Sequence, residues 1–176
     1  MQSIDIEREY YVAALLVMLG TGILCFYRKR NLLVSMAWAF LAGYLFLIYS
    51  STVIRRDVGK EYDYDFHIFW SYIAAWKRGK TYLLYLNIAN TMMLLPVGFL
   101  AGYIGINDYK CALLLGAGIS GVIEMSQLLL KRGMFEFDDI LHNALGCLLG
   151  YLVYQAVKWM IEKIWSREKK NPCHIP

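Results

Sequence analysis

Five apolar runs, each about as long as a helix that crosses a bilayer, constrain this chain more than any other feature. They fall at about residues 10–27, 32–54, 82–105, 111–130 and 139–160, and most charged residues lie between or beyond them. Soluble domains of this length rarely concentrate their apolar residues into runs of about 20 residues. The sequence predicts an all-α, polytopic membrane bundle of about five transmembrane helices.

The composition fits one integral membrane domain over residues 1–176. Of the 176 residues, 59% are hydrophobic and only 18% are charged. We expect residues 82–160 to form the core and residues 161–176 to form a basic cytoplasmic tail that is soluble and frayed. The net charge of +4 comes from short loops beside the spans, which indicates contact with anionic headgroups and not nucleic-acid binding. The four cysteines show no CxxC spacing and are interpreted as packing residues.

Basic residues set the expected orientation. Arg28, Lys29 and Arg30 fall on the same side of the bundle as the basic tail, and the positive-inside rule makes that side cytoplasmic. The opposing segment, residues 57–80, also carries lysine and arginine, so the charge bias is not clean. We expect a cell-membrane protein with its N-terminus outside and its C-terminus in the cytoplasm.

Aromatic and apolar side chains recur at helical spacing over residues 66–76, within that opposing segment. An aromatic-rich amphipathic helix at the membrane interface fits this pattern. Two roles stay open for this helix: it anchors the bundle, or it covers the polar end of the bundle as a lid.

Three of the spans contain polar side chains near the end of the bundle that adjoins residues 57–80. Glu124 lies well inside an apolar run, where a carboxylate costs at least about 2.5–3.5 kcal/mol, so it is a candidate functional residue by default. Helical spacing places it on one face with its polar neighbours in the same run. The polar residues expected at this end are Asn87, Asn90, Ser120, Glu124, Gln127, Asp139 and Asn143. They predict a polar pocket that opens at the outer leaflet.

Three polar blocks follow one another in a fixed order along the chain. They read Asn87-x-x-Asn90 before Pro96-x-Gly98, then Ser120-x-x-x-Glu124-x-x-Gln127, then Arg132-x-x-x-Glu136-x-Asp138-Asp139-x-x-x-Asn143-x-x-Gly146. Together they resemble the VanZ-like family of bacterial membrane proteins over residues 87–151, with a weaker likeness at residues 65–72. The resemblance implies a multi-pass cell-membrane protein and a link to low-level resistance against the glycopeptide teicoplanin. It implies no defined catalytic activity.

The resemblance also carries over to single positions. The family's asparagine before Pro-x-Gly falls on Asn90, its buried Glu and Gln on Glu124 and Gln127, and its closing Asp-x-x-x-Asn on Asp139 and Asn143. Two positions depart from the family pattern. Glu136 stands where the family usually has aspartate, which weakens the case for tight metal geometry there. Ile68 and Phe69 stand where the family has Pro-Phe, so we expect the interfacial helix to run through them.

Several chemical roles stay open for these residues. Glu124 could pair with Arg132 or bind Asn90 as a structural polar lock. The cluster Glu136, Asp138, Asp139 and His142 could hold a divalent cation such as Ca²⁺ or Mg²⁺. The competing interpretation makes Asp138 a helix N-cap and Asp139 a first-turn residue favoured by the helix dipole. No other cofactor is predicted, and Arg132 would suit a phosphate or carboxylate headgroup.

We therefore expect a membrane protein that recognises a membrane lipid or a lipid-linked component of the cell envelope. In this interpretation Arg132 binds the anionic group, while Glu124, Gln127, Asn90 and Asn143 shape the pocket. Two alternatives remain. A membrane-embedded enzyme would use Glu124 or Asp139 as its general base. A small transporter or flippase subunit would use Glu124 as a relay and would need to form a homo-oligomer.

Overall fold

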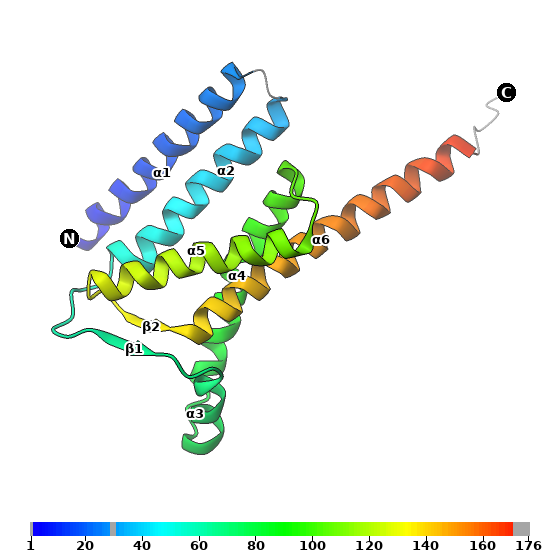
Figure 1. Cartoon of the computed structure of the whole chain (residues 1–176). Coiled ribbons are helices and arrows are strands. Elements are labelled where there is room, and N and C mark those ends of the chain that lie inside the picture. Colours follow the sequence, from blue (N-terminus) through cyan, green and yellow to red (C-terminus); the bar gives the residue numbers. More distant parts are fainter. Residues whose placement is uncertain (1, 29–30, 171–176) are drawn as a thin grey trace.

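The computed structural model describes residues 2–28 and 31–170, and in this part of the chain it consists of helices and two short strands (Figure 1). In chain order the elements are α1 (Gln2–Tyr27), α2 (Leu32–Tyr49), the π-helix η1 (Ser50–Ile54), β1 (Asp63–Asp65), α3 (Trp70–Arg78), α4 (Tyr82–Ile104), α5 (Tyr109–Leu129), β2 (Met134–Glu136) and α6 (Phe137–Lys170). Five helical stretches are long and apolar enough to cross a membrane: Arg8–Tyr27, Leu32–Ile54, Tyr82–Ile104, Tyr109–Leu129 and Phe137–Arg167. The predicted all-α membrane bundle is confirmed.

Glycines bring the backbones of α4 and α6 into direct contact. A Cβ atom on Gly146 would lie 1.9 Å from the carbonyl oxygen of Thr91, and one on Gly150 would lie 1.9 Å from that of Leu95. On the opposite helix, a Cβ atom on Gly98 would lie 1.8 Å from the carbonyl oxygen of Cys147. Small residues allow this close approach, which supplies the dispersion contacts that hold helices together in lipid.

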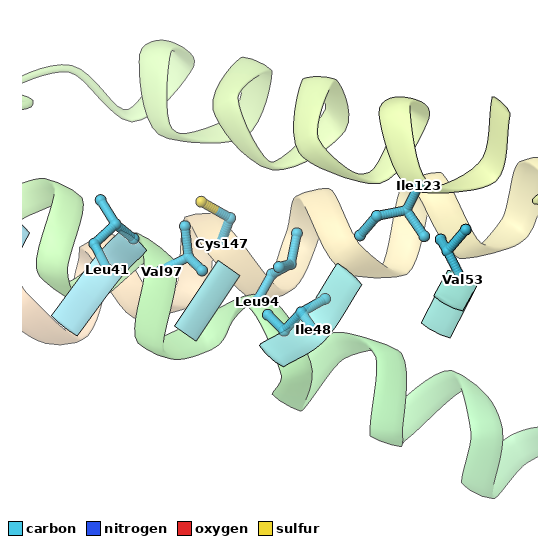
Figure 2. Close-up of a cluster of buried hydrophobic side chains, with 7 residues drawn as sticks. All are labelled: Leu41, Ile48, Val53, Leu94, Val97, Ile123 and Cys147. Carbon is cyan, nitrogen blue, oxygen red and sulfur yellow. The ribbon is translucent and has the colours of Figure 1, made fainter. Parts of the chain in front are cut away.

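A cluster of buried apolar side chains joins α2, η1 and α5 to this α4–α6 seam (Figure 2). Leu94 and Val97 of α4 are fully buried at its centre. The cluster consists of Leu41, Ile48, Val53, Leu94, Val97, Ile123 and Cys147. These residues come from α2, η1, α4, α5 and α6, so one core fixes the positions of four spans.

Helix α1 lies at the edge of the bundle and packs mainly against α2 (Figure 1). Leu16 and Leu19 are 64% and 61% exposed, as expected for a helix that turns most of its surface to lipid. This helix therefore contributes little to the core around α4 and α6.

Several short elements gather at one end of the bundle, where α5 ends and α6 begins (Figure 1). Strand β1 pairs in parallel with β2, with Asp63 opposite Met134 and Asp65 opposite Glu136. The segment after η1 also binds the α5–α6 loop, because the Gly59 N–H donates to the Lys131 carbonyl oxygen at 2.6 Å. We refer to this region as the polar end.

Three boundaries differ by four or more residues from the sequence-based expectation. Helix α1 begins at Gln2, not at residue 10. The amphipathic helix begins at Trp70, not at Phe66, because Phe69 adopts a left-handed conformation with φ of 63°. The prediction of a frayed tail from residue 161 is also wrong, because α6 continues to Lys170. Residues 161–170 contain neither glycine nor proline and are rich in lysine, arginine and glutamate, which favour helix. Residues 171–176 lie outside the described part of the chain.

Candidate functional site

A buried polar network ties α3 to α4 and α6. The Asp138 carboxylate accepts hydrogen bonds from the backbone N–H of Phe69 at 2.5 Å and of Ser71 at 3.3 Å. The Ser71 hydroxyl also donates to Asp138 at 2.8 Å and accepts from the Asn87 amide at 3.0 Å. All three side chains are at most 5% exposed. Asp138 thus caps the start of α3, a helix distant in sequence, and the expectation that it caps its own helix is wrong.

His142 reinforces this attachment one turn further along α6. Its Nδ1 lies 2.6 Å from the carbonyl oxygen of Asp138, and its Nε2 lies 2.7 Å from the Tyr72 hydroxyl. Because a carbonyl oxygen only accepts, Nδ1 carries the proton. In the neutral ring Nε2 is then an acceptor, and the Tyr72 hydroxyl donates to it. The Tyr72 and His142 rings also stack, with centroids 5.6 Å apart.

Three carboxyl groups lie together beside this network, and we call them the carboxylate cluster: Glu124, Glu136 and Asp139. Glu124 is only 2% exposed, and its carboxylate accepts a hydrogen bond from the Glu136 backbone N–H at 3.0 Å. The side-chain amide of Asn90 faces the Asp139 carboxyl group. The positive charge of Arg56 acts on both Glu124 and Asp139.

Glu136 lies in the short strand between α5 and α6, outside the membrane-spanning helices. Burial raises the pKa of its carboxyl group to about 7, and the charges of Asp139, Asp138 and Asp65 act in the same direction. The Trp70 indole N–H faces the Glu136 carboxyl group and offsets part of this rise in pKa. Glu136 therefore exchanges its proton near neutral pH.

Gln127 and Arg132 bind backbone carbonyl groups at the end of the second span. The Gln127 amide donates to the Thr52 carbonyl oxygen at 3.0 Å, and an Arg132 guanidinium N–H donates to the carbonyl oxygen of Ile54. Both acceptors belong to the π-helix η1. The predicted pairing of Glu124 with Arg132 is therefore wrong, because Arg132 points to η1 while Glu124 binds Glu136.

Ser120 and Asn143 form a separate pair, deeper between α5 and α6. The Asn143 amide donates to the Ser120 hydroxyl at 2.8 Å, and both side chains are at most 1% exposed. Helix α5 approaches α6 here because Gly116 has no side chain: a Cβ atom would lie 2.9 Å from the Ala144 Cα. This pair binds the two helices to each other.

The structure gives no support to the divalent cation considered for Glu136, Asp138, Asp139 and His142. Among the described side chains of residues 8–28 and 31–167, no three histidine, cysteine, aspartate or glutamate residues are placed to hold a metal ion. The hydrogen bonds of Asp138 and His142 explain this: the Asp138 oxygens face N–H and hydroxyl donors, and both His142 nitrogens have protein partners.

Three residues of the site were not predicted from the sequence. Ser71 and Tyr72 belong to α3, where the aromatic pattern drew attention to the opposite face. Arg56 follows the second span, and the three polar blocks of the sequence do not include it. One signal in the sequence could have identified Arg56. It follows the end of the second span, and Asp139 begins the fifth span, so the two residues are expected on the same side of the membrane.

Comparison with known proteins supports a family assignment. A family model described as VanZ/LLP1 matches residues 32–158, which is most of the chain and includes every site residue described above. No curated protein and no solved structure gives a match. With its five candidate membrane spans, the chain is a multi-pass membrane protein and belongs to the VanZ/LLP1 family.

Proposed function

We propose that this protein acts at the bacterial cell envelope, where it binds the headgroup of a membrane lipid or of a lipid-linked envelope component. In this proposal the polar end faces the outer leaflet, and binding reduces the access of teicoplanin-type glycopeptides to the cell surface. Membership of the VanZ/LLP1 family supports the link to the envelope. The carboxylate cluster at the polar end is the observation that carries the proposal.

The chemistry of the cluster indicates what kind of headgroup it would accept. Ionised carboxyl groups only accept hydrogen bonds, so they favour hydroxyl or ammonium groups, as found on sugars and amino lipids. Glu136, Asp139 and Asn90 are partly exposed and can reach a ligand, whereas Glu124 is buried and holds the loop before α6 in place. The exposed Arg56 supplies a cation beside them for a phosphate.

Arg56 replaces Arg132 in the expected recognition of an anionic group. One guanidinium nitrogen of Arg132 already donates to the Ile54 carbonyl oxygen. Fewer of its N–H groups are therefore available for a bidentate contact with an anionic headgroup. Arg132 then supports the site by fixing the end of η1.

A growth assay tests this proposal. Cells that express the wild type, Asp139→Asn or Glu162→Gln are compared at graded teicoplanin concentrations, and each purified protein is melted in detergent. We expect Asp139→Asn to lose resistance while its Tm stays near that of the wild type. The exposed Glu162, at the far end of α6, is the matched control and should change neither quantity. Full resistance in Asp139→Asn would remove the carboxylate cluster from the mechanism.

The pKa of Glu136 favours a second candidate function, catalysis on a lipid-linked precursor. A carboxyl group with a pKa of about 7 can give and take a proton at neutral pH, as a general acid or base requires. Purified protein incubated with membrane lipid extract would then change the lipid composition, and Glu136→Gln would abolish the change. A binding protein leaves the extract unchanged.

A further inference from the structure

A groove of about 500 Å³ lies between α3 and the beginning of α4, outside the carboxylate cluster. Its apolar walls include Ile73 and Trp76 of α3 and Leu84 of α4. Lys77 and Thr81 also line it and provide an ammonium and a hydroxyl group. A mostly apolar cavity of this size with a few polar groups is typical of a small-ligand site.

The groove exists because α3 turns its small side chains toward the bundle. Ser71, Ala74 and Ala75 are buried, whereas Ile73 is 51% exposed and Trp76 is 91% exposed. The described residues therefore leave about half of Ile73 and most of Trp76 uncovered. Ile73 and Trp76 thus present adjoining apolar surface to the surroundings of the protein.

Chain connectivity places this exposed face at the boundary of the bilayer. Only three residues, Gly79, Lys80 and Thr81, separate the end of α3 from the start of α4. Four chain steps join Arg78 to Tyr82 and cover at most about 14 Å, so α3 ends within that distance of the membrane-spanning helix. Tryptophan is enriched at this level, where its ring sits among headgroups and the ends of acyl chains.

The positive charge at the end of α3 favours a lipid with an anionic headgroup. Lys77 and Arg78 are its only charged residues, and Lys80 follows in the linker. Anionic lipids attract such a basic group beside the membrane surface. From these observations we propose that the groove binds one anionic glycerophospholipid, with an acyl chain against Ile73, Trp76 and Leu84 and the phosphate on Lys77 and Thr81. This site does not depend on the ligand of the carboxylate cluster.

Fluorescence quenching by brominated lipids tests the proposal on the full-length protein. The protein is reconstituted in phosphatidylcholine vesicles that contain either dibrominated phosphatidylglycerol or dibrominated phosphatidylcholine at the same mole fraction. The contribution of Trp76 is the difference between the wild type and Trp76→Phe. We expect phosphatidylglycerol to be preferred about fivefold at Trp76, the effect of one lysine near an anionic surface.

Two variants that each remove one positive charge, Lys77→Gln and Arg78→Gln, test whether the lipid phosphate binds in the groove. Lys77 lines the groove and Arg78, the next residue, does not, so Lys77→Gln should remove most of the preference and Arg78→Gln should keep most of it. Asp139→Asn should leave the preference unchanged, which separates this site from the carboxylate cluster. Equal quenching by the two lipids, no quenching of Trp76, or equal losses in Lys77→Gln and Arg78→Gln would each overturn the proposal.

Discussion

Among single residues, Glu136 has a protonation state that links stability to pH. Its pKa is raised from 4.5 to about 7 in the folded protein. Between these pH values the folded protein keeps a proton that the unfolded chain has released, so stability falls as the pH rises through this window and then levels off. We expect Glu136→Gln to melt at a higher temperature than the wild type near pH 8 and to match it near pH 4.5.

Thermal unfolding in detergent across this pH range measures the effect. The difference between Glu136→Gln and the wild type isolates Glu136 from the other carboxyl groups. Glu162→Gln is the control, because Glu162 is exposed near the opposite end of α6. A constant difference in Tm at every pH would show that Glu136 has the same pKa in both states.

The sequence identified most residues of the site but not their partners. Glu124 stood out because a carboxylate inside an apolar run requires a partner. Its hydrogen-bond donor is the backbone N–H of Glu136. Every residue except proline has a backbone N–H, so the sequence does not indicate which one binds Glu124. The partner of Asp138 was missed for the same reason, since it too binds backbone N–H groups. Residue identity predicts which side chains need hydrogen bonds, whereas the fold decides which backbone supplies them.

At the level of helices, the α4–α6 seam depends on the missing side chain of Gly146. In Gly146→Ala the new Cβ would lie 1.9 Å from the Thr91 carbonyl oxygen, so the two helices must separate. We expect a loss of about 1–3 kcal/mol, as for other overpacked contacts, and a lower Tm in detergent. Gly118→Ala is the matched control, because nothing lies within 4 Å of its Cβ position. Equal melting of the two variants would show that the helices are not in contact at Gly146.

The attachment of α3 is a second property at this level. Asp138→Asn keeps one acceptor oxygen but loses the charge, and its amide N–H group faces the donors on Phe69 and Ser71. Hydrogen bonds to a charged group are worth about 1.5–3 kcal/mol, so α3 should open more often while the spans stay folded. Hydrogen exchange should then accelerate in residues 70–78 and remain slow in α4 and α6.

Asp108→Asn is the control for this measurement. Asp108 caps α5 through the Lys110 N–H, and asparagine is an equally good N-cap. It should leave exchange in α3 unchanged. Unchanged exchange in Asp138→Asn as well would mean that packing alone holds α3.

Helix ends that depend on local hydropathy were predicted more accurately than ends that depend on contacts with distant residues. The ends of α4 and α5 were predicted within about two residues, because hydropathy over 20 residues sets the length of a span. The start of α3 was predicted four residues too early, since the conformation of Phe69 depends on Asp138, 69 residues away. The pairing of β1 with β2 was not predicted at all, because strands of three residues leave no periodic signal.

For the whole molecule, the orientation in the membrane is the central expectation to test. The structure places the last turn of α1, the first turn of α2 and the last turns of α6 at one end of the bundle and the polar end at the other (Figure 1). The basic residues between α1 and α2 in the sequence and those on α6 predict that the polar end lies outside the cell. In a chain without its own cysteines, His67→Cys should react with an impermeant maleimide in intact cells, because His67 is 88% exposed.

Arg167→Cys, on the exposed last turns of α6, completes the topology experiment. It should react only after the cells are permeabilised. The reverse pattern would place the polar end in the cytoplasm and exclude a role in binding outer-leaflet lipids.

The buried network between α3, α4 and α6 has a consequence for the timing of synthesis. Ser71 and Asn87 are made before Asp138, and 51 residues separate Asn87 from it. At about 5–20 residues per second, a ribosome needs roughly 3–10 s to cover this distance. During these seconds α4 enters the membrane with an asparagine whose final hydrogen-bond network does not yet exist. The last helix completes the polar end, so a translational pause before α6 prolongs the time that Asn87 spends in the membrane without Asp138.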